Sequence, residues 1–162
     1  MPGQGIRRAQ DWIIVQTTSS RKVRAINDLT TNEIPMLSIR GLNKSFGSNS
    51  EVQAVGDLNL DVLNGEIFTL LGPSGCGKTT TLRLIGGLEY PDSGQIILNG
   101  RPIVSVQEKI FVPPHKRNMG MVFQSYAVWP HLTVFENIAY PLKARHLPAA
   151  EIRNKVSQVV SL

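Results

Sequence analysis

The 162-residue sequence predicts an α/β domain in which antiparallel β-hairpins accompany a strand–turn–helix unit. An apolar, strand-sized run at Ile67–Leu71 leads through a glycine-rich turn into a helical pattern that starts near Lys78. Asn-Gly pairs at Asn64-Gly65 and Asn99-Gly100 stand between alternating apolar and polar residues, a pattern typical of hairpins. Hydrophobic residues make up 41% of the chain, which is enough to bury the core of one ordinary domain.

Composition narrows the class of protein. No window reaches the roughly 18 consecutive apolar residues that a membrane span requires, so we expect any role at a membrane to depend on a partner. The N-terminal run "DWIIVQTTSS" is too short and lacks a small-residue cleavage site, so it does not predict a signal peptide. Cys76 is the only cysteine, which fits a reducing compartment. We therefore expect a cytoplasmic protein.

The charge distribution argues against a nucleic-acid partner. The formal net charge is +5, which could serve to neutralise phosphates. The basic residues are, however, spread along the chain, with no run of five or more and no interleaved aromatic residues of the RNA-binding kind. We interpret them as solvated surface and expect no binding of nucleic acid.

The strand pattern begins after an N-terminal extension. Residues 1–35 show no sustained period of either kind, so we expect them to be poorly ordered. From Met36 onward the pattern changes, and Leu37–Leu42 alternates apolar and polar residues. Leu58, Leu60 and Val62 then lie on one face of a second predicted strand. We expect residues 36–162 to form the structured domain.

Each Asn-Gly pair predicts a two-residue hairpin loop. Residues 60–71 predict two antiparallel strands joined by a type I′ turn at Asn64-Gly65, and residues 95–103 predict a second hairpin at Asn99-Gly100. The strand Ile67–Leu71 would belong to the first hairpin and lead directly into the glycine-rich turn.

That turn matches the phosphate-binding pattern G-x-x-x-x-G-K-[ST] at every specified position, from Gly72 to Thr79. The glycines, Gly72, Gly75 and Gly77, would permit positive φ angles and a close backbone approach, so that N–H groups converge on an anion at the start of a helix. Lys78 would place a compact charge on the β and γ phosphates, and the Thr79 hydroxyl would ligate Mg²⁺. The predicted phosphate-binding residues are Gly72, Ser74, Gly75, Cys76, Gly77, Lys78, Thr79 and Thr80.

The helix that follows the turn should place Leu82 and Ile85 on a common face and stop at Gly86-Gly87. This strand–loop–helix context is the one in which the motif binds a nucleoside triphosphate. A transporter ATPase, a GTPase and a small-molecule kinase all use such a loop. The guanine-reading Asn-Lys-x-Asp of a GTPase is absent after the loop, and the length of chain before it weakens the kinase interpretation.

Further motifs show a resemblance to one family: residues 36–162 resemble the first half of an ABC-transporter ATPase subunit. "LNKSFG" at Leu42–Gly47 resembles the segment whose aromatic residue stacks on adenine, and "GGLEYPDSGQIILNG" resembles the stretch after the first core helix. "MGMVFQ" at Met119–Gln124 resembles the strand leading to the family's glutamine loop. The run "VPPHKRNMGMVFQSYAVWPHLTVFENIAYPLK" is similar to importer ATPases that serve iron(III), polyamines and sugars.

The resemblance implies a P-loop NTPase fold of the ABC ATPase type, here incomplete, with N-terminal antiparallel β-hairpins and a partial RecA-like core. It implies ATP and Mg²⁺ as ligands, Phe46 as the adenine-stacking residue, and Gln124, at the end of the expected strand "MGMVF", as a second Mg²⁺ contact beside Thr79. It also implies two partners, a membrane-embedded permease subunit and a second ATPase subunit. The expected location is the inner face of the cell membrane, as a peripheral subunit.

The sequence departs from the family pattern in its catalytic half. The Leu-Ser-Gly-Gly-Gln signature, the apolar strand ending in Asp-Glu and the switch histidine are absent, and no Asp or Glu follows four apolar residues. We therefore expect a domain truncated before the signature motif, which binds ATP without hydrolysing it. The alternatives are a non-hydrolysing nucleotide-binding or regulatory module and, with less support, a small-molecule P-loop kinase.

Residues 125–148 are the predicted permease-docking surface. The segment opens with Tyr126 and Trp129 before Pro130, a composition expected of an interface. Thr133 and Glu136 have the spacing of a capping box, and Pro141 should kink or break the helix that follows. The alternative is that Trp129, Phe135 and Tyr140 pack against the domain's own core. A last helix should carry an apolar stripe that the sequence leaves partly uncovered, Ile152, Val156, Val159 and Val160.

Overall fold

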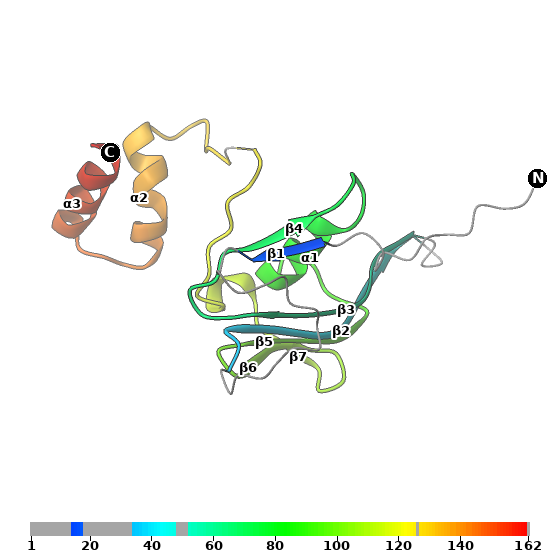
Figure 1. Cartoon of the computed structure of the whole chain (residues 1–162). Coiled ribbons are helices and arrows are strands. Elements are labelled where there is room, and N and C mark those ends of the chain that lie inside the picture. The colour runs from blue at the N-terminus through cyan, green and yellow to red at the C-terminus, as the bar shows by residue number, and fades with distance from the viewer. Residues whose placement is uncertain (1–13, 18–33, 48–51, 126, 162) are drawn as a thin grey trace, which may run out of the picture. The chain divides into compact units, whose positions relative to one another are not determined.

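The structure, a computed structural model, describes residues 14–17, 34–47, 52–125 and 127–161 (Figure 1). The chain divides into two compact units, Met1–Gly120 and Met121–Leu162. The first unit holds the strands and the helix α1, and the second holds the helices α2 and α3. Each unit is described by itself below.

The first unit is built on a five-stranded antiparallel sheet in the order β3-β2-β5-β6-β7. Its strands are β2 (Leu37–Phe46), β3 (Val52–Val62), β5 (Ser93–Leu98), β6 (Arg101–Ser105) and β7 (Ile110–Phe111). A bulge in β2 between Ile39 and Leu42 shifts the alternation so that both side chains stay buried.

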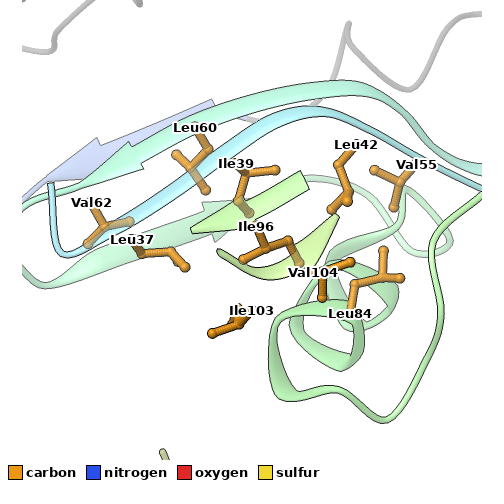
Figure 2. Close-up of a cluster of buried hydrophobic side chains, with 10 residues drawn as sticks. All are labelled: Leu37, Ile39, Leu42, Val55, Leu60, Val62, Leu84, Ile96, Ile103 and Val104. Atoms are coloured by element: carbon orange, nitrogen blue, oxygen red, sulfur yellow. The ribbon is translucent and has the colours of Figure 1, made fainter. Parts of the chain in front are cut away.

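One face of this sheet forms the main core. Buried hydrophobic side chains from four strands and from α1 gather in a single cluster, and they point toward one another in Figure 2: Leu37, Ile39, Leu42, Val55, Leu60, Val62, Leu84, Ile96, Ile103 and Val104. Leu58 is partly buried against the same cluster, so the predicted face of β3 is confirmed. Period-2 patterning therefore placed the inward face of β3 correctly, whereas in β2 it holds for Leu37 and Ile39 but not beyond the bulge.

The two Asn-Gly pairs behave differently. β5 and β6 form the predicted hairpin, with Leu98 opposite Arg101, and both Asn99 (φ 49°) and Gly100 (φ 73°) have the positive φ of a type I′ turn. The predicted hairpin at Asn64-Gly65 is wrong. β3 pairs with β2, whereas β4 (Phe68–Leu71) pairs with β1 (Ile14–Thr17), both antiparallel.

The turn geometry explains that difference. Gly65 has φ 73° but Asn64 is not in the positive region, and the Glu66 N–H donates to the Leu63 carbonyl across 3.3 Å. A turn with positive φ only at its third residue is of type II, which does not match the twist of a two-stranded hairpin. The chain therefore leaves β3 and enters β4 without pairing the two strands. The pairing of β1 with β4 was not predicted, and the rest of the N-terminal extension lies outside the described residues, apart from Ile34 and Pro35.

Helix α1 (Lys78–Gly86) follows the glycine-rich turn and ends where the sequence predicted, with Gly87 as its left-handed cap (φ 76°). Thr81 and Leu84 are fully buried on its inner face, and Ile85 is partly buried against the core. Leu82 is 52% exposed, so the buried face lies one position away from the predicted pair. The Leu88 N–H donates to the Arg83 carbonyl (2.9 Å), which completes the helix end.

A buried arginine closes the C-terminal end of α1. Arg117 is 2% exposed, and its Nη1 donates to the carbonyls of Leu84 (2.9 Å) and Ile85 (2.7 Å), while its Nε donates to the Val112 carbonyl (2.7 Å). Desolvation lowers the pKa of this guanidinium, but it stays charged at neutral pH because an arginine pKa starts so high. A cation at a helix C-terminus is favourable. A Cβ on Gly87 would come within 2.6 Å of the guanidinium, so a larger residue at the cap would require Arg117 to move.

The predicted strand at Met119–Phe123 is wrong. No residue from 118 to 123 is in a strand, and within the described part of the chain their backbone groups make no hydrogen bonds. Val122 is fully exposed. An apolar run becomes a strand only where a neighbouring strand accepts its hydrogen bonds, and among the described residues no strand runs beside this one.

The second unit is a pair of helices, α2 (Val134–Ala144) and α3 (Ala149–Val160). Their contact buries Ala139, Ile152 and Val156, with partly buried apolar side chains around them. Val159 and Val160 are 57% and 63% exposed, so the far end of the predicted stripe is uncovered. α2 continues through Pro141 without a break. Among the described residues, no helix has the length and hydrophobicity needed to cross a membrane.

Candidate functional site

The predicted phosphate loop connects β4 to α1 as a compact turn. Gly75 (φ 81°) and Gly77 (φ 92°) have the left-handed backbone that glycine favours, whereas Gly72, against the prediction, does not. Gly77 has a second constraint, because a Cβ at this position would overlap the carbonyl oxygen of Ala54 in β3. The last glycine of the motif therefore lets the loop lie directly against the sheet.

The start of α1 presents free N–H groups. Gly77 is the N-cap, no side chain caps this end, and the first turn contains no acidic residue. Within the described residues, the N–H groups of residues 77–80 donate no hydrogen bond, although helix starts usually receive a capping acceptor. Four free donors with the positive end of the helix dipole are suited to a phosphate group.

Lys78 adds a full positive charge to the loop. Its Nζ donates to the carbonyls of Gly72 (2.8 Å) and Pro73 (2.7 Å) and lies 3.4 Å from Cys76 Sγ. The Lys78 side chain thus connects the first residues of the loop to the start of the helix. These carbonyls are weak partners compared with an anion, so a phosphate can draw the ammonium away from them.

The three threonines at the start of α1 differ in burial. Thr79, the predicted Mg²⁺ ligand, is exposed, and Thr80 is half-buried. Thr81 is fully buried, and its hydroxyl donates to the Gly77 carbonyl (3.0 Å), which fixes the entry of the helix. Thr81 was not among the predicted residues. Its role cannot be read from the sequence, because burial alone separates it from the two preceding threonines.

Phe46 and Gln124 belong to different units. Phe46 ends β2 in the same unit as the loop and is 41% exposed. Gln124 is an exposed residue of the second unit, outside helices and strands, so its contact with Mg²⁺ stays a prediction. The structure therefore brings Gly72–Thr80 together in one loop and leaves the roles of these two residues to be tested.

A second candidate site lies in the unit 121–162, on the predicted docking segment. A groove of about 330 Å³ is lined by Trp129, His131, Leu132, Glu136, Tyr140 and Lys143. The Trp129 ring lies 5.9 Å from the His131 ring and 5.8 Å from the Tyr140 ring, between ring centroids. Trp129, Phe135 and Tyr140 are 49%, 42% and 50% exposed, so they are not buried in a core of the structure.

Two sets of hydrogen bonds hold the residues of this groove in place. The predicted capping box is confirmed: Thr133 Oγ1 accepts from the Glu136 N–H (3.2 Å), and Glu136 accepts from the Thr133 N–H (2.9 Å) and hydroxyl (2.8 Å). The hydrogen bond from the Thr133 backbone lowers the pKa of Glu136, with smaller contributions from the Thr133 hydroxyl and nearby cations. The second set, made by Asn137, was missed at the sequence level because a half-buried helical asparagine carries no distinctive pattern.

Asn137 ties the aromatic loop to α2 through its side-chain amide. Its Oδ1 accepts from the Trp129 N–H (2.8 Å), and its Nδ2 donates to the carbonyls of Trp129 (3.2 Å), Leu132 (3.0 Å) and Thr133 (3.0 Å). These bonds fix the backbone at Trp129, which no strand or helix holds.

The chain belongs to the ABC transporter family, because the sequence model of that family matches residues 55–161. Among curated proteins it is similar to the spermidine/putrescine import ATP-binding protein PotA of Acidothermus cellulolyticus, with 48% identity over 85% of this chain and 34% of the relative. The trehalose/maltose import ATP-binding protein MalK of Thermococcus litoralis is 53% identical over 74% of this chain and 31% of the relative. The chain thus spans about a third of the length of these relatives.

Solved structures give the same class. The dimeric, post-hydrolysis ATP-binding cassette MJ0796 bound to ADP and Pi superposes with a TM-score of 0.61 at 26% identity, over 76% of this chain and 55% of that one. A second dimeric structure of MJ0796 gives a TM-score of 0.59 over 74% of this chain and 53% of that one. The fold is therefore part of the ABC ATPase fold, as the sequence predicted.

Proposed function

We propose that this chain binds MgATP through Gly72–Thr80 as the nucleotide-cradling part of an importer's ATP-binding subunit. The observation that carries the proposal is the start of α1, where four free N–H groups lie beside a lysine ammonium. No acidic side chain is present in this first turn. This donor set fits the phosphate groups of a nucleotide. The matched structure bound to ADP and Pi and the import ATP-binding relatives add support.

In this proposal the residues have distinct roles. The loop N–H groups and Lys78 bind the β and γ phosphates, and the exposed Thr79 hydroxyl holds Mg²⁺, which neutralises phosphate charge when it is bound. Phe46 provides a stacking surface for adenine, and Gln124 is the second proposed Mg²⁺ contact. The glycines Gly75 and Gly77 keep the backbone close enough to form the cradle.

Calorimetric titration of MgATP into the full chain tests this proposal. The unchanged chain should bind, Lys78→Ala should lose binding, and Lys116→Ala, which removes an exposed lysine elsewhere in the same unit, should bind as the unchanged chain does. Equal binding by Lys78→Ala and the unchanged chain would show that the loop is not the site.

We further propose that the 162-residue chain binds ATP without turning it over. None of its Asp or Glu residues follows an apolar strand-like run, so no carboxylate is placed to orient a water molecule as a general base. A phosphate-release assay should show only background. Turnover of about 1 s⁻¹ or faster that disappears in Lys78→Ala would overturn this part of the proposal.

Residues 125–148 are proposed to dock onto a membrane-embedded permease subunit, which would place the protein at the inner face of the membrane. The support is the groove with its exposed Trp129 and Tyr140, held in place by Asn137 and the capping box. Exposed aromatic side chains on an ordered backbone are typical interface hot spots. The dimeric form of the matched structures likewise supports pairing with a second ATPase subunit.

Co-purification with the permease subunit tests the docking surface. Trp129→Ala and Tyr126→Ala should reduce recovery of the permease while ATP binding and the unfolding temperature stay unchanged. Val160→Ala serves as the matched control, since Val160 is also an exposed apolar residue but lies at the end of α3. Full recovery with Trp129→Ala, or a loss equal to that of the control, would contradict the assignment.

A further inference from the structure

The end of β2 that carries Phe46 lacks a strand on one edge. β2 pairs with β5 only as far as Asn43, opposite Ser93, but it pairs with β3 up to Phe46, opposite Val52. Among the described residues, those at positions 44–46 have no strand partner on the β5 side. This edge is occupied instead by the segment that follows α1, Glu89–Asp92.

Three consecutive residues of β2 are bonded to that segment. The Asp92 N–H donates to the Asn43 carbonyl (2.9 Å), Lys44 Nζ donates to the Tyr90 carbonyl (2.8 Å), and the Ser45 N–H donates to Asp92 Oδ2 (2.6 Å). These bonds replace the ladder that β5 no longer supplies. The backbone just before Phe46 is therefore fixed by the segment Glu89–Asp92.

Lys44 is the centre of this contact. Its side chain is only 13% exposed, and its Nζ lies 3.1 Å from Glu89 Oε1 and 3.6 Å from Asp92 Oδ1, in addition to the Tyr90 carbonyl. Lysine usually keeps its ammonium in water, so a largely covered ammonium with two carboxylate neighbours is held in one place. The Tyr90 carbonyl accepts a hydrogen bond from this ammonium, and the two carboxylates form ion pairs with it.

The same ammonium contacts the Phe46 ring. Nζ lies 5.1 Å from the ring centroid, a cation–π distance. The contact covers one face of the ring, while the residue stays 41% exposed. A ring fixed on one side by a cation can receive a planar base on its other side.

We propose that Lys44 is a positioning residue for the nucleobase. Lys44 fixes the Phe46 ring to Glu89–Asp92, the segment that follows α1. Because α1 starts at the phosphate loop and ends just before Glu89–Asp92, this short helix connects the phosphate loop to the segment that holds Lys44 and, through it, the Phe46 ring. This inference rests on the proposed function, since it requires adenine to stack on Phe46.

Titrations with a ligand that has the base and a ligand that lacks it test the inference. MgATP and magnesium tripolyphosphate are titrated into the unchanged full chain, Lys44→Met, Phe46→Ala and the control Lys116→Met. Lys44→Met, which keeps most of the length of the side chain but not its charge, should weaken ATP binding about fivefold, within the range of base–aromatic effects, and leave tripolyphosphate binding unchanged. Lys44→Arg should retain most of the ATP affinity because it keeps a cation there.

The double variant separates positioning from an independent contribution. If Lys44 acts through the ring, Lys44→Met should cause no further loss of ATP affinity once Phe46 is alanine. Equal losses for ATP and tripolyphosphate in Lys44→Met, or fully additive losses in the double variant, would overturn the inference. Should Lys44→Met fail to fold, Asp92→Asn weakens the same support, and it should show the same selective loss of ATP affinity.

The outcomes also distinguish this inference from the proposed function. If Phe46→Ala weakens ATP but Lys44→Met does not, the stacking role stands and the role of Lys44 is wrong. If Phe46→Ala leaves ATP affinity unchanged, the stacking surface itself is wrong and the inference falls with it. If the unchanged chain binds neither ligand, both are overturned.

Discussion

The two units differ in how much apolar surface they bury, and this difference separates a binding scaffold from a contact surface. In the described residues, the first unit gathers ten buried hydrophobic side chains in one cluster, and the helix pair of the second unit gathers three. The phosphate loop is attached to the larger core through α1, whose Leu84 is part of it. A deep core fixes a backbone cradle, whereas a shallow helix pair leaves aromatic side chains free for a partner.

The largest effect is expected from a substitution at the point where the phosphate loop meets the sheet. Gly77→Ala requires a residue at φ 92° and a Cβ that overlaps the Ala54 carbonyl, so the loop must move. We expect a loss of about 3 kcal/mol in the free energy of unfolding, together with loss of ATP binding. Gly65→Ala is the matched control, because Gly65 also has positive φ but open space around it. Similar losses in both variants would mean that backbone strain alone, and not the close approach, sets the requirement for glycine.

Core truncations compare the two units directly. Leu84→Ala removes a fully buried side chain from the large cluster and should cost about 3 kcal/mol. Val156→Ala removes fewer atoms from the small cluster, beside exposed neighbours, and should cost about 1 kcal/mol. Chemical denaturation monitored by circular dichroism gives both values. A larger loss for Val156→Ala would contradict the view that the second unit is the shallower one.

Arg117 provides a prediction at the far end of α1. Arg117→Met leaves the carbonyls of Leu84, Ile85 and Val112 without their donor, and we expect a loss of about 2 kcal/mol in the free energy of unfolding. The exposed Arg101→Met should change stability little. Thermal unfolding measures both, and an unchanged unfolding temperature in Arg117→Met would show that water satisfies these carbonyls equally well.

The smallest expected effect is the pH dependence of the cap on α2. The folded protein lowers the pKa of Glu136, so the unfolded state binds the proton more readily at mildly acidic pH. The contribution of the cap is complete above the ordinary glutamate pKa of about 4.3 and is lost as the pH falls through the lower folded value. NMR titration of α2 amides should show the first turn fraying there, and Glu136→Gln should remove this dependence. A first turn that stays intact to the lowest pH would contradict the capping assignment.

The predictions from sequence succeeded where the local chain decides its own geometry. The hairpin at Asn99-Gly100, the capping box at Thr133 and the stop of α1 at Gly87 each depend on a few neighbouring residues, and all three are confirmed. The order strand, glycine-rich turn, helix was confirmed for the same reason, whereas the binding of phosphate by that turn stays a prediction.

The failures occurred where distant partners decide. Asn64-Gly65 has the same dipeptide as the successful hairpin, but β3 finds its partner in β2, so the turn takes another form. The run Met119–Phe123 is apolar enough for a strand but has no neighbouring strand among the described residues. Arg117 stands in the basic run "HKR", which predicts surface, and only the fold shows that its guanidinium is buried against α1. Such contacts between residues far apart in the chain cannot be read from one sequence.

The most direct test of the account is amide hydrogen exchange of the full chain with and without MgATP. We predict that MgATP slows exchange at residues 75–80, of which residues 77–80 have free N–H groups without the nucleotide, and leaves the helices α2 and α3 almost unchanged. Lys78→Ala should show no such protection. Unchanged exchange at residues 75–80 with ATP bound, or protection confined to residues 134–160, would contradict the claim that the phosphate loop is the nucleotide site.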